Sequence, residues 1–183
     1  MKNKTIKLDS STIITIRKKL DAEIIKSWRT IRHENVMSVK EIKAGLGSGK
    51  DLKALFNQIL QMQEKRIKIK GMLVALNTGH TTFDFEEFKK TNNYSIFAAC
   101  EAKEAIEQLN MIPTIDPALK AKKGPAGTGK KELFASSAKK ASLIKTLQLK
   151  ANKFDAALEK FNNETSIELP EGMSEEFKEY LIL

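Results

Sequence analysis

Apolar residues recur every three or four positions in two long stretches of the chain, which is the spacing that places them on one face of an α-helix. In the clearer stretch, Asp51–Leu76, the steps alternate between three and four along Leu52, Leu55, Ile59, Met62, Arg66, Ile69, Leu73 and Leu76. Further apolar residues widen the stripe, which is typical of a helix in a bundle. Arg66 interrupts it, and we expect its guanidinium either to reach water or to meet a carboxylate of a neighbouring helix.

The second stretch with this spacing covers 131–162 and ends at Asn162-Asn163. Its predicted buried stripe comprises Leu133, Phe134, Ala141, Ile144, Leu147, Ala151, Phe154, Leu158 and Phe161. Because such a stripe must be covered, we expect the two long helices to pack against each other or against a companion subunit. The helix over Asp51–Leu76 would be about 40 Å long at 1.5 Å per residue, so the bundle should be elongated.

Shorter helices are predicted between these two and before them. The first spans about 11–34, where Asp9 and the three residues after it offer N-cap side chains. Its apolar face comprises Ile13, Ile16, Leu20, Ile24, Trp28 and Ile31. Another begins at Ser38–Glu41, which has the form of a capping box, and ends at Gly45, Gly47 and Gly49. A third covers about 95–110, and its apolar face carries Ile96, Phe97, Cys100 and Ile106.

The remaining segments are shorter or irregular. Phe83, Phe85 and Phe88 predict a short strand leading into a helical turn, with the rings in the core rather than on a stacking platform. Residues 113–130 contain three prolines and three glycines, which predicts an exposed loop. The tail, 163–183, is predicted to end in a short helix that docks onto this protein or a partner through Tyr180, Leu181, Ile182 and Leu183.

These elements together predict one domain over 1–183 of the mainly α class. We expect an elongated helical bundle with two long helices and short extended segments at the termini, around 5–8 and 166–169.

Composition removes several kinds of site from consideration. Cys100 is the only cysteine, so no intramolecular disulfide and no cysteine-based zinc site can form. Apolar runs such as Met72–Leu76 are far shorter than the roughly 20 residues of a membrane span, and no apolar signal region follows Met1. We therefore expect a protein that contacts no membrane and works in the cytoplasm or inside a viral particle.

The inventory of catalytic side chains is thin. His33 on a predicted helix and His80 in a turn occupy positions more typical of surface or structural histidines, and Cys100 is expected to be a buried, unreactive thiol. The sequence carries no GxSxG elbow, no HExxH pair and no acidic calcium loop. We therefore predict a protein that is not an enzyme, with no catalytic residue, no metal and no cofactor.

One glycine-rich segment, Gly124–Lys130, resembles the phosphate-binding loop of the P-loop nucleotidases. In that family a Ser or Thr after the lysine holds magnesium, and a buried hydrophobic strand precedes the loop. Here Lys131 occupies the position of the Ser or Thr, and Leu119–Lys123 occupies the position of the hydrophobic strand. ATP hydrolysis is therefore not expected. A glycine-rich turn at the start of a long helix can still hold an anion. Gly45–Lys50 has a weaker version of this character, and we interpret it as a flexible connection capped by Asp51.

Charge is distributed unevenly along the chain. The whole chain carries a formal net charge of +9, and residues 120–150 contain nine lysines against one acid. The candidate anion-binding or nucleic-acid-binding residues are Lys120, Lys122, Lys123, Lys130, Lys131, Lys139 and Lys140. Because lysine dominates and few aromatic residues alternate with it, contact with phosphates is favoured over base reading.

Three functions remain open at this point. The leading hypothesis is a structural or interaction subunit of a larger assembly with other protein subunits, and the Lys- and Asn-rich composition would suit a bacteriophage particle component. The first alternative is a small basic nucleic-acid-associated protein that contacts phosphates through Lys120 to Lys150. The second alternative is an inhibitor that binds another protein.

Overall fold

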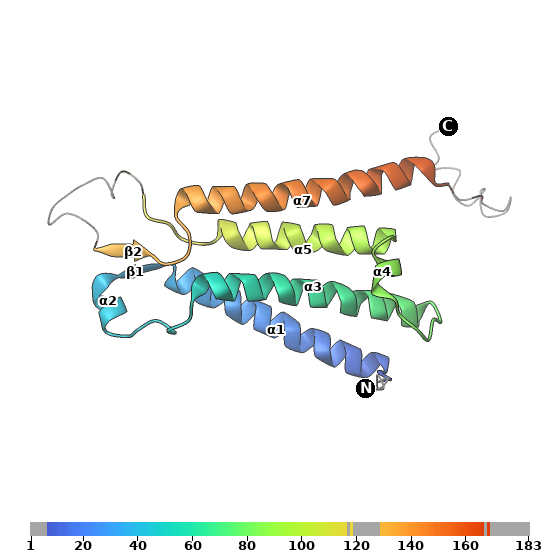
Figure 1. The fold of residues 1–183 in the computed structure, drawn as a ribbon, viewed down its shortest axis with the longest axis horizontal. Coiled ribbons are helices and arrows are strands. Elements are labelled where there is room, and N and C mark those ends of the chain that lie inside the picture. The colour runs from blue at the N-terminus through green and yellow to red at the C-terminus, as the bar shows by residue number, and fades with distance from the viewer. Residues whose placement is uncertain (1–6, 117, 119–128, 167, 169–183) are drawn as a thin grey trace, which may run out of the picture.

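Four long helices dominate the part of the chain that the structure describes. The computed structural model describes residues 7–116, 118, 129–166 and 168. Helices α1 (Ser10–Glu34), α3 (Leu52–Asn77), α5 (Asn92–Asn110) and α7 (Ser137–Glu164) lie side by side in this order, and each runs antiparallel to the next (Figure 1). The predicted class, a mainly α and elongated helical bundle, is confirmed.

Helix ends follow the capping residues of the sequence. The Asp51 carboxylate accepts the amide of Lys53 at 2.8 Å where α3 begins, and Gly79 closes the helix with a φ of +81° that favours glycine. At α2 (Val39–Lys43) both bonds of the predicted capping box are present: the Glu41 amide donates to Ser38 Oγ, and the Ser38 amide donates to Glu41 Oε2. Local side-chain chemistry therefore sets these boundaries.

The helices pair differently from the prediction. Helix α3 packs along α1 and α7 packs along α5, while a smaller α3–α5 contact joins the two pairs. The two predicted long helices therefore do not form an extended pair with each other. The joint core lies toward the end of the bundle that carries the two strands, and its fully buried large side chains include Ile24, Trp28, Ile31, Ile59, Leu109 and Ile112. Periodicity identifies a buried face but does not identify the helix that covers it.

The start of α7 is also different from the prediction. Strand β2 (Lys130–Glu132) pairs antiparallel with β1 (Val36–Ser38), and helix α7 begins only at Ser137, with Ser136 as its N-cap. Leu133 is consequently 44% exposed rather than part of a helical stripe, although Leu147 and Ala151 are buried as predicted. The pairing with a distant strand outweighs the local helical pattern.

Helix α5 turns a different face to the core than predicted. Its buried positions are mainly the alanines Ala98, Ala102 and Ala105 and the residue Leu109, whereas Ile96 is 41% exposed and Cys100 is exposed. The prediction of a buried Cys100 is therefore wrong. Small side chains allow the helices on either side to approach closely, so alanines rather than the larger residues line the packed face.

Phenylalanines form a second apolar cluster at the end of the bundle opposite the strands. Phe88, on the short helix α4 (Phe85–Phe88), is buried, and the rings of Phe83, Phe85 and Tyr94 surround it with centroids 5.5 to 6.5 Å away. The predicted core position of these rings is confirmed. The predicted strand at Phe83 is absent, because 79–84 is an irregular connection.

The N-terminal half of α1 is only partly covered. Ile13 is buried, but Ile14 and Ile16 are 42% and 37% exposed, and in the other half of the helix Ile25 is 48% exposed. The predicted buried position of Ile16 is therefore wrong. Figure 1 shows the reason, since α1 diverges from α3 toward its N-terminus.

Candidate functional site

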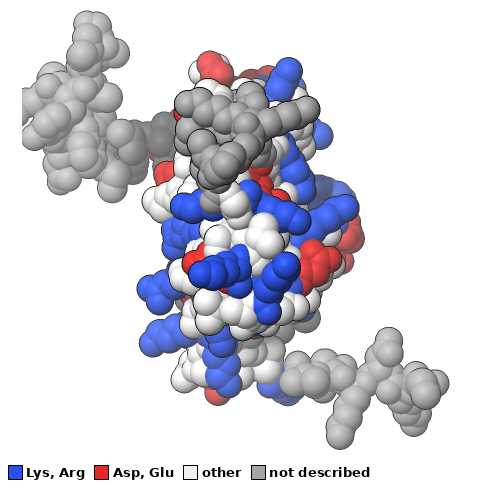
Figure 2. Space-filling view, turned by 90° about the vertical axis from the view of Figure 1, so that its left-hand side faces the viewer, with Lys and Arg blue, Asp and Glu red and all other residues white. Residues whose placement is uncertain are grey.

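Basic side chains from several elements meet at the end of the bundle that carries the two strands. We call this region the basic end and define it as β1, α2, the connection 44–51, β2 and the first turns of α3 and α7. Figure 2 looks onto this end and shows Lys and Arg side chains over much of its described surface. It brings together residues that lie about ninety positions apart in the sequence, since Met37 of β1 faces Lys131 of β2.

A buried asparagine holds the frame of the basic end. Asn35, 0% exposed, follows α1 and donates through Nδ2 to the carbonyls of Pro113 (2.7 Å) and Ala135 (2.8 Å). Its Oδ1 accepts the amides of Phe134 (3.0 Å) and Ala135 (2.8 Å). All donors and acceptors of this side-chain amide are used, and three segments of the chain are fixed to one another.

Of the seven predicted anion-binding lysines, four lie in the described part of the chain. Lys130 and Lys131 are exposed on β2, while Lys139 and Lys140 occupy the first turn of α7. Lys120, Lys122 and Lys123 lie outside the described residues, as do Gly124–Thr128. Gly129 and Lys130 lead into β2 and not into α7, so the expectation that this glycine-rich segment opens a long helix is wrong.

Lys139 and Lys140 have internal partners. Lys139 Nζ donates to the carbonyl of Phe134 at 2.7 Å and lies over its ring, 4.8 Å from the centroid. Lys140 Nζ donates to the carbonyl of Ile112 at 3.1 Å, beyond the C-terminus of α5, where a cation also complements the helix dipole. Their charges add to the field of the basic end, but their geometry is set by packing.

Four further lysines belong to the basic end and were not grouped from the sequence. Lys40 and Lys43 are exposed on α2, Lys50 lies in the connection before α3, and Lys53 is in its first turn. Each is separated from β2 by roughly eighty or ninety residues in the numbering. A sequence signal was present only indirectly, because these lysines flank the capping box and the glycine-rich connection.

Carboxylates in and beside the basic end bind backbone amides. Glu34 is buried and accepts the amide and the hydroxyl of Ser48, both at 2.9 Å. Glu132 accepts the amide of Ile115 at 2.7 Å. The hydrogen bonds that Glu41 accepts from Ser38 lower the pKa of this carboxyl, and nearby positive charge adds to the effect. These carboxylates thus fix the backbone of the basic end.

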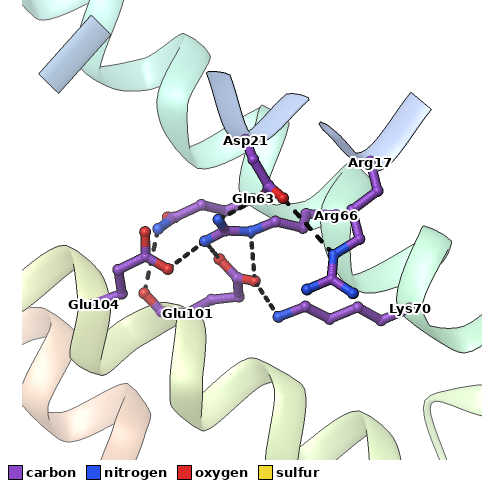
Figure 3. A network of polar contacts seen from close by, with 7 residues as sticks. All are labelled: Arg17, Asp21, Gln63, Arg66, Lys70, Glu101 and Glu104. Carbon is purple, nitrogen blue, oxygen red and sulfur yellow. Dashed lines mark hydrogen bonds and ion pairs between the residues drawn. The ribbon is translucent and has the colours of Figure 1, made fainter. Parts of the chain in front are cut away.

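Many ion pairs lie away from the basic end. The largest group surrounds Arg66 in the middle of the bundle (Figure 3), where Glu101 receives a bidentate contact and Asp21 and Glu104 complete the set. Lys70 Nζ donates to Glu101 Oε1 at 2.9 Å. The pKa of Arg66 is raised: burial opposes its charge, but hydrogen bonds and charge from these acids outweigh that effect. The predicted carboxylate partner of Arg66 is confirmed.

Five lysines of the basic end lack such partners. Within the described residues, Lys40, Lys43, Lys50, Lys53 and Lys131 form no ion pair with a carboxylate. Unneutralised charges that converge from separate elements raise the local positive potential, which attracts anions.

The other predicted sites contribute little geometry. His33 and His80 are exposed, and Tyr180–Leu183 lie outside the described residues. In the described ranges, no group of histidines, cysteines and carboxylates could hold a metal ion, and no helix has the length and apolarity of a membrane span. A groove of about 660 Å³ at the opposite end is lined by residues that include Val74, Phe83 and Phe88.

Comparison with known proteins supplies no further assignment: no protein-family model, no curated protein and no solved structure matches this chain.

Proposed function

We propose that this protein is a non-enzymatic nucleic-acid-binding protein that contacts the phosphate backbone through the basic end. The observation that carries the proposal is the convergence of lysines without carboxylate partners, Lys40, Lys43, Lys53 and Lys131 among them, on a frame that Asn35 holds together. A rigid frame spares the ordering cost that flexible basic tails incur on binding.

Lysine-rich surfaces of this kind favour backbone contact without sequence specificity. A lysine ammonium is a compact point charge that neutralises a phosphate, and base-specific contacts usually require arginine, asparagine or glutamine against a base edge. Binding should therefore be weakly specific and should fall steeply as salt concentration rises.

Titration of the full chain with labelled single- and double-stranded oligonucleotides over a series of salt concentrations tests this proposal. The variant K40Q/K131Q removes one exposed lysine from α2 and one from β2. If each lysine contacts a phosphate, the negative slope of log K against log salt should become shallower by about 1.4 to 1.8 in this variant. The variant K65Q/K153Q, which removes two exposed lysines outside the basic end, should leave the slope almost unchanged. Undetectable binding of the unaltered chain at low salt, or equal effects of the two variants, would overturn the proposal.

A second candidate is an interaction subunit of a larger assembly, such as a bacteriophage particle. The observation that favours it is the partly uncovered α1, where Ile14, Ile16 and Ile25 are exposed on a helix that diverges from α3. A covering subunit would remove this apolar surface from water. Light scattering tests the candidate: a stable oligomer that I14E/I25E dissociates supports it, and a strict monomer with no partner recovered from the native source argues against it.

A further inference from the structure

A polar groove of about 410 Å³ lies between the middle of α1 and the first turns of α3. Helix α1 lines it with Lys19, Glu23, Lys26 and Ser27, and Lys50 lines it from the residue before the N-cap of α3. The groove therefore adjoins the basic end, because Lys50 belongs to both. No phosphate-binding pattern in the sequence marks it, since its residues come from two helices.

Charge in this groove is positive and unneutralised. Lys19, Lys26 and Lys50 form no ion pair with any described carboxylate, although Glu23 lines the same groove. Three lysines against one carboxylate leave a net positive site. Lys19 and Lys26 are two turns apart, about 10 Å along the helix, so their side chains can reach adjacent phosphates of one strand.

A hydroxyl on the same groove offers a further hydrogen-bond donor. Ser27 is 7% exposed and lines the groove, yet no hydrogen bond joins its hydroxyl to another described residue. The neighbouring hydroxyl of Thr30, by contrast, donates to the carbonyl of Lys26 at 3.2 Å. A phosphate oxygen is a strong acceptor for the hydroxyl that Ser27 offers to the groove.

We propose that this groove is a phosphate-binding site that takes successive phosphates of a nucleic-acid strand lying on the basic end. The assignment rests on the proposed function and adds a defined path from the basic end along α1. Ammonium and hydroxyl donors line the groove without an aromatic side chain, so it recognises the backbone and not the bases.

Oligonucleotide affinity of the full chain at about 0.1 M salt tests the groove. At this salt each phosphate contact contributes about 5- to 8-fold, so K19Q/K26Q should weaken binding by about 25- to 60-fold. The matched variant K65Q/K153Q has the same net charge and should weaken it by less than about 3-fold. Removing the groove's carboxylate with E23Q should strengthen binding, whereas E159Q on α7 should change it little.

Ser27 supplies a readout that charge alone would not move. The variant S27A should melt at about the same temperature as the unaltered chain, because the hydroxyl makes no hydrogen bond to another described residue, and it should nevertheless bind more weakly. Thermal unfolding followed by circular dichroism checks that each variant is folded.

The outcomes separate this site from the proposed function. Oligonucleotide binding that K19Q/K26Q reduces no more than K65Q/K153Q overturns the groove and leaves the basic end as the binding surface. No binding by the unaltered chain overturns both. Inorganic polyphosphate provides the remaining arm: if it binds through Lys19 and Lys26 while oligonucleotides do not, the nucleic-acid assignment of the groove is wrong.

Discussion

The buried contact between Arg66 and Glu101 allows a quantitative test of how the bundle is held together. The two side chains are 9% and 5% exposed, and Glu101 also receives Lys70. In R66M, Glu101 would stay buried with Lys70 as its remaining ionic partner, and removing one member of a buried pair costs about 3 to 5 kcal/mol. In E101L, Arg66 keeps Asp21 and Glu104, so we expect a smaller loss of about 1.5 to 3 kcal/mol.

The double variant R66M/E101L should be much less destabilised than the two single changes combined. It removes both buried charges together, and replacing a buried ion pair by apolar residues of similar volume is often close to neutral. We therefore expect a coupling energy of at least about 3 kcal/mol from urea unfolding at 25 °C. The surface pair Lys103–Asp155, with side chains 53% and 42% exposed, provides the control, and its cycle should give less than about 1 kcal/mol.

Additivity would refute this reasoning. If the Arg66 and Glu101 changes add to within about 0.5 kcal/mol, the two side chains are energetically independent and the network does not join α3 to α5. A loss in E101L that exceeds the loss in R66M would also contradict it, because the structure gives Arg66 more remaining carboxylates than it gives Glu101 basic partners.

Three further predictions concern stability. N35D keeps the side-chain oxygen that accepts two backbone amides, but it replaces the donating Nδ2 by an oxygen that would face two carbonyls. Urea titration should show a loss of about 2 to 5 kcal/mol in the free energy of unfolding, and N35Q should not restore it. The folded-state pKa of Glu41 is lowered, so its contribution to α2 is present above the ordinary value of 4.5 and is lost as pH falls through the folded value. The protection factor of the Ser38 amide in hydrogen exchange should fall there, and E41Q should remove this pH dependence. G71A should destabilise the folded chain by about 1 kcal/mol, although alanine has the better helix propensity, because its Cβ would lie 2.8 to 2.9 Å from two phenylalanine rings. An increase in melting temperature would contradict this packing.

The helices were predictable because the signals that define them are local. The periodic apolar residues of Asp51–Leu76 and the side chains that cap it lie within the segment itself, and α3 agrees with the prediction to within a residue. The sequence indicated that Arg66 could meet a carboxylate, but not which residue would supply it. That Glu101 of α5 and Asp21 of α1 supply it depends on how three helices pack, which a single periodic pattern does not contain.

Errors occurred where distant segments or small residues decide the structure. Leu133 and Phe134 fit a helical stripe numerically, but pairing of β2 with β1 keeps them outside α7. On α5 the alanines form the packed face, and a prediction weighted by side-chain size selected Ile96 and Cys100 instead. Hydrophobicity alone does not show which face of a helix must carry small side chains so that neighbouring helices can approach closely.

In the candidate site, too, the local features were predictable and the contacts between distant segments were not. The sequence shows nine lysines within residues 120–150, but it cannot show that Lys40, Lys43 and Lys53 lie at the same end of the bundle. That proximity follows from β1–β2 pairing and from Asn35, which together bring the end of α1 and the start of α7 to one place.

Carboxylates decide whether this surface can bind an anion. Glu34 and Glu132 accept backbone amides and so hold the connections of the basic end in place, and the buried Glu34 forms no ion pair with a described lysine. Elsewhere in the bundle, acids such as Glu101 neutralise the cations beside them. The same residue type therefore stabilises the helices in the middle of the molecule and leaves the charge at one end available. Because like charges repel when they are held close together, an anionic partner that neutralises them gains from a surface already arranged to receive it.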